Sequence, residues 1–87
     1  MFDYRQFADH INKVLSLLGE RLPESRKSSV SSLVNVGEWE LALETLCDNL
    51  YEDETPISSD IYTSIAEAGR MLNADDDLWI ILSSQIE

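Results

Sequence analysis

The sequence predicts an all-α fold, a compact single-domain bundle of about five short helices over residues 1–87. Apolar residues recur at roughly the 3.6-residue period of an amphipathic helix in every segment between turn residues. The run Leu78–Leu82 can also be interpreted as a buried strand, but no second strand-like segment is available to pair with it. A chain of this length has room for one hydrophobic core.

The first helix is predicted over Tyr4 to Leu18. Asp3 is a suitable N-cap, Gln6 completes a capping-box pattern, and Phe2 and Phe7 occupy the two positions of a hydrophobic staple. Gly19 follows as a stop signal. The apolar stripe of this helix consists of Tyr4, Phe7, Ile11, Val14, Leu15 and Leu18. His10 lies off the stripe, and we expect it to be solvated.

A second helix begins near Pro23, which suits a first helical turn, and ends near Gly37. Its five serines have weak helix propensity, so packing of its stripe of Val30, Leu33 and Val34 must stabilise it. Half of the basic residues of the chain lie just before or within it: Arg21, Arg26 and Lys27.

The third helix lies within Gly37 to Thr55, and Pro56 stops it. Its buried stripe is predicted to consist of Trp39, Ala42, Leu43, Leu46, Cys47 and Leu50. Cys47 is the only cysteine, which excludes an intramolecular disulfide, and its place on the stripe predicts a small buried hydrophobe.

Ser58 or Ser59 caps a fourth helix whose stripe is Ile61, Ile65, Ala68 and Leu72. Gly69 inside this helix indicates a close helix crossing, because glycine there costs about 1 kcal/mol relative to alanine. Asn73 is a suitable left-handed stop. We expect Asp75 to cap a fifth helix with a stripe of Leu78, Ile81 and Leu82.

Together these stripes predict one shared core. We expect that core to contain Phe7, Ile11, Leu15, Leu33, Leu43, Leu46, Ile61, Ile65, Leu72 and Leu82.

Six basic and seventeen acidic residues give the chain a net charge of −11, which is large for 87 residues. Such a field repels nucleic acid and anionic membranes and attracts basic partners. The N-terminus lacks the pattern of a signal peptide, and no apolar run approaches the roughly 20 residues of a membrane span. We expect a cytoplasmic protein that is monomeric when free and binds neither nucleic acid nor membrane directly.

The third helix carries four acids at intervals of four residues opposite its apolar stripe. This acidic ridge consists of Glu40, Glu44, Asp48 and Glu52. Like charges at this spacing repel by about 0.2–0.5 kcal/mol per pair. Asp53 and Glu54 add negative charge at the helix end, where the macrodipole prefers cations, and few Lys or Arg residues lie nearby in the sequence. A run of charges is usually a solvated face, and 17 acids in 87 residues make some clustering expected. Two interpretations stay open: plain surface, or a binding surface that also includes Asp53 and Glu54.

No motif in the chain indicates catalysis, a cofactor or a metal. Asn73, Asp75 and Asp77 match the start of a calcium loop, but Leu78 and Ser84 occupy the positions that require Gly and Glu. The Asp-Ser-Leu motif on which acyl carrier proteins carry their cofactor does not occur. We expect no enzymatic activity, no cofactor and no metal site.

The stretch Trp39–Glu52, followed by Pro56-Ile57-Ser58 and the helix from Ile61 to Leu72, resembles the MafI-type immunity family. These are small cytoplasmic bacterial proteins that protect cells from polymorphic and contact-dependent growth-inhibition toxins. The likeness covers roughly Val30 to Leu82. It implies an all-α antitoxin that binds one cognate toxin domain, often a ribonuclease or another nuclease. It assigns no contact residue, because immunity surfaces vary with their toxins.

The sequence therefore predicts an immunity protein that neutralises a basic nuclease toxin by covering it with an acidic surface, in a one-to-one complex. The alternative is a small acidic helical adaptor that binds a basic partner other than a toxin.

Overall fold

Asp3 is the N-cap of helix α1 (Tyr4–Leu18), as the capping pattern predicts. The structure is a computed structural model, and it describes residues 2–87. One Asp3 carboxylate oxygen accepts hydrogen bonds from the backbone N–H groups of Arg5 and Gln6, at 3.0 and 3.1 Å. The rings of Phe2 and Phe7 lie 5.8 Å apart, which confirms the hydrophobic staple. The start of the bundle is thus fixed by local interactions.

Over residues 2–87 the chain forms five α-helices, two short 3₁₀ helices and no strand, which confirms the all-α fold class. After α1 the elements are η1 (Gly19–Arg21), α2 (Glu24–Asn35), α3 (Trp39–Glu52), α4 (Ser59–Met71), α5 (Asp77–Ile80) and η2 (Ser83–Gln85).

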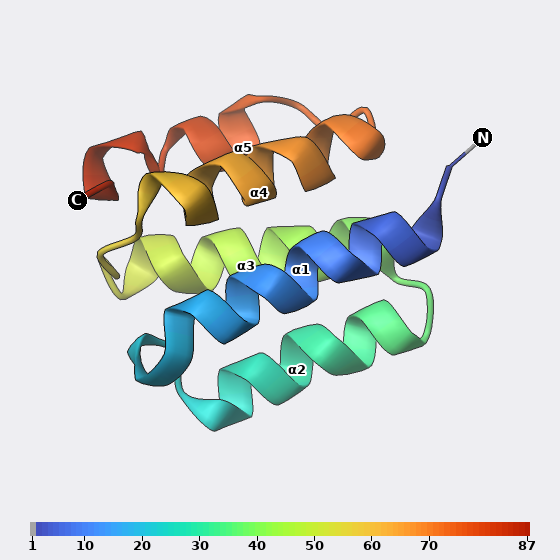
Figure 1. The fold of residues 1–87 in the computed structure, drawn as a ribbon, viewed down its shortest axis with the longest axis horizontal. Helices are drawn as coiled ribbons and strands as arrows, with labels where there is room; N and C mark the ends of the chain where they lie inside the picture. Colours follow the sequence, from blue (N-terminus) through green and yellow to red (C-terminus); the bar gives the residue numbers. More distant parts are fainter. Residues whose placement is uncertain (1) are drawn as a thin grey trace.

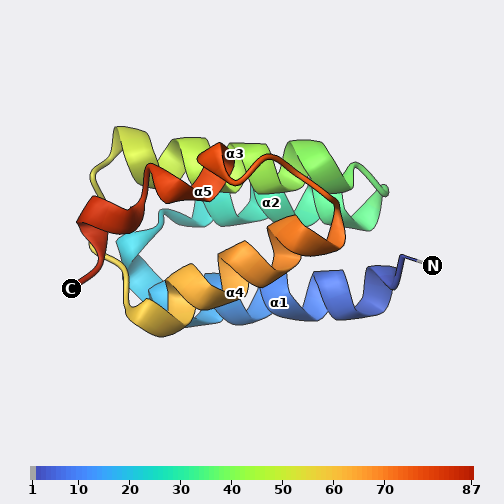
Figure 2. The ribbon, with the colours of Figure 1, turned by 90° about the horizontal axis from the view of Figure 1, so that it is seen from above.

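The helices form two layers (Figures 1 and 2). Helices α1 and α4 run antiparallel and pack along each other in one layer, and α2 and α3 form an antiparallel pair in the other. Helix α5 contacts both α3 and α4 and so closes one edge of the bundle. The start of α1 and the C-terminus lie at opposite ends of the molecule (Figure 1).

Eight of the ten residues expected in the core are buried there. The other two, Leu33 and Leu72, are half-buried and pack against the core from its edge. Cys47 is completely buried, and burial, together with the charges of Asp48 and Glu44, raises the pKa of its thiol to about 12. The cysteine is therefore a neutral core residue at physiological pH, as its position on the stripe predicts.

Residues with positive φ follow four of the helices. Gly19 has φ +53° after α1, Gly37 has φ +81° after α2 and Asn73 has φ +54° after α4, so all three predicted stop signals are confirmed. Ser58 caps α4 by accepting the backbone N–H of Ile61 at 3.2 Å. Helix α3 ends at Glu52, and Glu54, with φ +50°, follows two residues later, two residues before the proline that the sequence indicates as its stop.

The fifth helix differs most from its prediction. It is a helix rather than a strand, but it has only four residues, and its buried side chain is Trp79. Ile81, predicted on the stripe, is 41% exposed. The predicted cap is wrong by one residue, since Asp76 is the N-cap of the helix, and Oδ1 of Asp75 accepts the backbone N–H of Asp77 at 3.0 Å. The side chain of this segment that enters the core is thus its largest apolar one, Trp79, which is 2% exposed.

Gly69 provides the space for that side chain. A Cβ at this position would lie within 2.7 Å of three carbon atoms of the Trp79 indole, closer than van der Waals contact allows. The sequence predicts a close helix crossing at Gly69. The structure has a close contact there, but the group that approaches Gly69 is the aromatic ring of Trp79 rather than the backbone of another helix. The prediction that His10 is solvated is wrong. Its side chain is only 19% exposed, and its Nε2 lies 3.5 Å from a carboxylate oxygen of Glu67.

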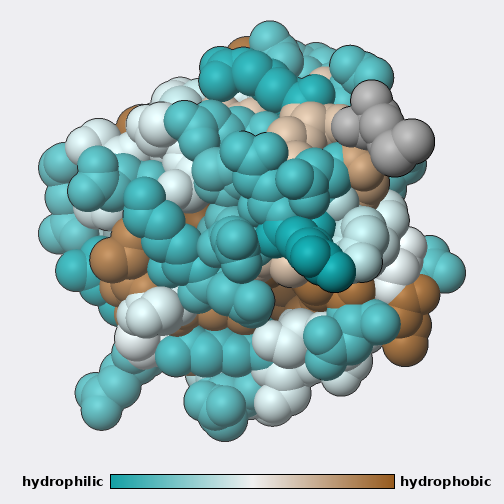
Figure 3. All heavy atoms as spheres, turned by 45° about the vertical axis from the view of Figure 1, so that its right-hand side comes forward, coloured by the Kyte–Doolittle hydropathy of each residue, from teal (hydrophilic) through white to brown (hydrophobic). Residues whose placement is uncertain are grey.

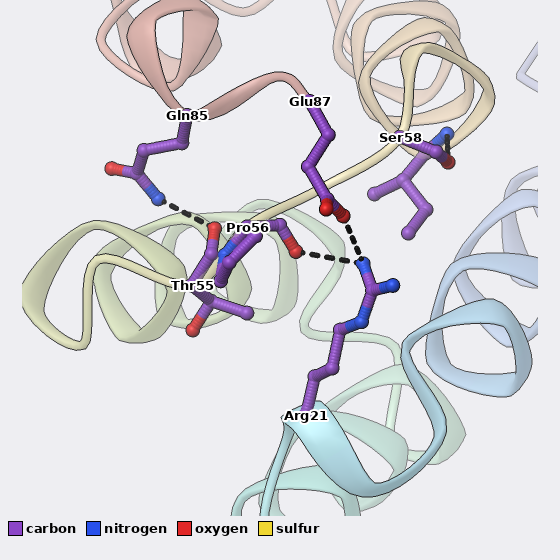
Figure 4. Close-up of polar contacts among 7 residues, drawn as sticks. Arg21, Thr55, Pro56, Ser58, Gln85 and Glu87 are labelled. Atoms are coloured by element: carbon purple, nitrogen blue, oxygen red, sulfur yellow. Dashed lines mark hydrogen bonds and ion pairs between the residues drawn. The ribbon is translucent and has the colours of Figure 1, made fainter.

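Side chains of the C-terminal segment form hydrogen bonds that hold the connection between α3 and α4 in place (Figure 4). The Gln85 side-chain amide donates to the carbonyls of Leu50 and Thr55, at 2.8 and 3.0 Å. Arg21 donates to the Pro56 carbonyl at 3.0 Å and pairs with Glu87 at 2.9 Å. The Leu50 carbonyl belongs to the last turn of α3, and the carbonyls of Thr55 and Pro56 lie in the connection that follows.

We expect Gly69→Ala to destabilise the protein by about 3 kcal/mol, since overpacking of a core usually costs 1–3 kcal/mol and the overlap with Trp79 here is severe. Helix propensity alone gives the opposite sign, a gain of about 1 kcal/mol. Chemical denaturation measures the difference. In a Trp79→Leu background the same change should cost less than about 1 kcal/mol, and a Gly69→Ala protein as stable as the wild type would contradict this packing.

Candidate partner-binding surface

The acidic ridge lies on the outer face of α3, and all four of its side chains are exposed. The opposite face of the same helix is fully buried at Ala42, Leu43, Leu46, Cys47 and Leu50. Because apolar and acidic residues each repeat at helical spacing, burial of the first set orients the second toward solvent. The sequence prediction of an exposed acidic face is confirmed, whereas its role in binding stays a prediction.

This outer face also exposes large apolar side chains. Leu41 is 48% exposed and lies one turn before Glu44, and Tyr51 is 52% exposed and lies one turn after Asp48. The neighbouring segment at α5 exposes Ile80 at 47% and Ile81 at 41%. The outer face of α3 therefore carries both acidic and large apolar side chains.

Asp53 differs from the other predicted site residues. Arg26, from α2, donates to the side-chain oxygen of Asn49, and its guanidinium lies 3.5 Å from Asp53. The expectation that basic residues are scarce near these acids is therefore wrong for Asp53. This carboxylate faces α2, and its pairing joins the two helices of one layer.

Glu54 adopts the left-handed conformation at the end of α3, where glycine is usual. The N–H of Glu54 bonds to the Tyr51 carbonyl at 3.2 Å, and that of Thr55 bonds to the Leu50 carbonyl at 3.1 Å. These two bonds form a Schellman motif. A left-handed residue with a side chain costs roughly 1–2 kcal/mol, and a carboxylate is also disfavoured at this end of the helix dipole. Glu54 is thus unfavourable for folding in two independent ways.

Two grooves adjoin the ridge. The first, which we call the Asp75 groove, has a volume of about 310 Å³ and is lined by Glu40, Leu43, Glu44, Leu72, Asn73, Ala74, Asp75 and Leu78. The second, the Pro56 groove, has a volume of about 690 Å³ and is lined by Tyr51, Glu52, Glu54, Pro56, Ser84 and Gln85. Asp48 lies between them along α3 and lines neither.

The structure thus divides five of the six predicted site residues among three places, and the sixth, Asp48, lines neither groove. Glu40 and Glu44 belong to the Asp75 groove, Glu52 and Glu54 to the Pro56 groove, and Asp53 to the contact with α2. Tertiary folding adds Asp75, which the pattern of α3 alone does not include. Helical spacing could also have predicted that Leu41 and Tyr51 are exposed, because both residues lie outside the buried stripe of α3.

Another face of the molecule, at the end where the chain begins, is covered mostly by hydrophilic side chains (Figure 3). Hydrophobic side chains are visible there in narrow bands between them. Near this end, Tyr4 stacks on Trp39 at a ring distance of 6.1 Å. This aromatic contact joins α1 to α3 and leaves Tyr4 half exposed.

Within residues 2–87, no group of three or more His, Cys, Asp or Glu side chains is placed to hold a metal ion. In the same residues, no helix has the length and apolar character needed to cross a membrane.

No family model, curated protein or solved structure matches the chain. The resemblance to MafI-type immunity proteins therefore stays a prediction from the sequence.

We expect Glu54→Gly to stabilise the protein by about 1 kcal/mol, because glycine adopts the left-handed conformation without strain. For a domain of this size, that gain corresponds to a rise of roughly 4–8 °C in melting temperature. Glu52→Gly is the matched control: it removes the same charge two residues earlier, at a right-handed helical position, and should cost about 1 kcal/mol. If both variants changed stability in the same direction, the strain at Glu54 would be refuted.

Proposed function

We propose that this chain is an immunity protein that binds a cognate bacterial toxin domain and neutralises it by occlusion. The observation that carries the proposal is the exposed face of α3, where acids repeat at a spacing that folding does not require. Three successive like-charge pairs and an acidic helix end oppose folding by roughly 1–2 kcal/mol in total. The resemblance of this helix to MafI-type immunity proteins supports the same function.

A basic nuclease domain is the partner that best suits this surface. A nuclease must hold an anionic nucleic acid in a positively charged cleft. A chain with a net charge of −11 is electrostatically complementary to that cleft and is attracted to it from a distance. The ridge would then occupy the region that the phosphates of the substrate require.

Charge and apolar contact have separate roles in this complex. Exposed carboxylates mainly raise the rate of encounter and set the orientation, because solvent and salt screen them. Buried apolar and aromatic side chains supply more of the lasting affinity. Leu41 and Tyr51, on the same face as the ridge, are the side chains placed for that second role.

Co-expression with the toxin domain encoded directly upstream tests the function. We expect the chain to protect cells in proportion to its amount and to form a one-to-one complex whose association rate falls steeply as salt increases. Loss of protection, or protection at far less than one equivalent, would contradict occlusion. A neighbouring gene that encodes no toxin, with capture of a basic partner of another kind, would favour the adaptor alternative.

The Glu44→Lys, Asp48→Lys double variant tests the surface. It should fold at least as well as the wild type, because the change relieves repulsion on α3. Affinity for the toxin domain should fall about 100-fold or more, which corresponds to about 3 kcal/mol.

The matched control is Asp9→Lys with Glu20→Lys, which changes the net charge equally but lies on α1 and on η1, away from α3 in the sequence. The control should retain affinity within about tenfold, since only long-range attraction is reduced. Equal losses in both double variants, with unchanged melting temperatures, would show that net charge rather than the α3 face governs binding.

A further inference from the structure

We propose that the Asp75 groove receives an arginine side chain of the partner protein. The aliphatic stem of the arginine would lie on the apolar floor, and its guanidinium would lie between the carboxylates of the rim. This inference deepens the proposed function and depends on it for the identity of the partner, but the groove and its chemistry are properties of this chain alone.

The floor of the groove is aliphatic. Leu43 is fully buried beneath it, whereas Leu72 and Leu78 are only half-buried and keep apolar surface that a guest can cover. Ala74 adds a small side chain that leaves room above it. The volume of about 310 Å³ lies at the lower limit of typical ligand pockets, so the groove suits a single side chain better than a whole helix.

The rim of the groove is anionic and comes from two separate parts of the chain. Glu40 and Glu44 lie one turn apart on α3, and Asp75 lies on the turn between α4 and α5. Among residues 2–87, no Lys or Arg contributes to the lining. A guest that carries a positive charge at the end of an apolar stem complements both the rim and the floor.

The part of the rim that comes from the α4–α5 turn is held in place before any guest binds. Asp75 accepts a hydrogen bond from the backbone N–H of Asp77 at 3.0 Å, which orients its carboxylate. At the adjacent end of α4, Asn73 and Ala74 donate backbone hydrogen bonds to the carbonyls of Arg70 and Gly69, at 3.1 and 3.0 Å. Because the turn is already ordered, less conformational entropy is lost when a guest binds.

Arginine fits this arrangement better than lysine does. The guanidinium is planar and carries five N–H donors in a fixed geometry, so it can bind more than one carboxylate at once. Carboxylates on two segments, with the Asn73 side chain beside them, provide several acceptors around one guest. A compact ammonium group would satisfy fewer of them.

Titration of the free protein with N-acetyl-arginine amide, followed by NMR, tests the groove. We expect saturable shifts at millimolar concentration in the signals of Leu43, Ala74 and Leu78. N-acetyl-norleucine amide, which keeps the stem and lacks the charge, should bind at least tenfold more weakly, and so should N-acetyl-lysine amide. Shifts spread evenly along α3, or centred on the Pro56 groove, would overturn the inference.

Two variants of equal charge change separate the groove from the ridge as a whole. Glu44→Gln should weaken binding of the arginine derivative at least tenfold, whereas Asp48→Asn, on the same ridge but outside the groove, should leave it within about twofold. Ala74→Leu fills the floor without altering any charge and should also abolish binding. Equal effects of Glu44→Gln and Asp48→Asn would overturn the inference in favour of a diffuse acidic surface.

These measurements use no toxin, so they separate the two proposals. Protection of cells by a protein that fails to bind the arginine derivative would overturn the groove assignment and leave the proposed function standing. Binding of the arginine derivative by a protein that fails to protect cells would overturn the proposed function alone.

Discussion

Burial of the inner face of α3 is the interaction on which the rest of the structure depends. Five consecutive stripe positions of this helix are fully buried, and α2, α4 and α5 all contact it. Burying one large aliphatic side chain contributes roughly 1.5–3 kcal/mol, so three leucines outweigh the repulsion among the ridge acids several times over. The outer face of α3 is therefore free to carry charges that do not help the helix to fold.

The unfavourable features of the chain concentrate at one end of that helix. Glu54 is left-handed, and several acids lie where the helix dipole prefers cations. The same connection is held by the amide of Gln85 and by the guanidinium of Arg21, which bind its carbonyl groups (Figure 4). Local strain is thus compensated by contacts from distant parts of the sequence, and the Pro56 groove is presented by a firmly held turn.

The acidic face and the two grooves have complementary physical properties. Exposed carboxylates act over about a Debye length, near 8 Å at physiological ionic strength, and can orient a basic partner before contact. Leu41, Tyr51 and the floor of the Asp75 groove act only in contact, through the loss of apolar surface. A surface that contains both kinds of group can combine fast association with specific docking.

The sequence by itself determined the class of fold, the first four helices and the direction in which α3 faces. These features depend on interactions between residues that are close in the chain: the Asp3 cap, the left-handed stops at Gly37 and Asn73, and the repeating stripe of α3. Helical spacing alone was enough to place Glu40, Glu44, Asp48 and Glu52 on one exposed face.

Only the tertiary structure decided how those residues combine into grooves. Trp79 rather than Ile81 enters the core because Gly69, ten residues earlier, leaves space for the indole. That packing sets the position of α5 and of the turn before it, and so brings Asp75 beside Glu40 and Glu44. The pairing of Asp53 with Arg26 likewise depends on how α2 packs against α3. Periodicity within one helix carries no information on such contacts, because they are fixed by the shapes of side chains that meet only after the chain has folded.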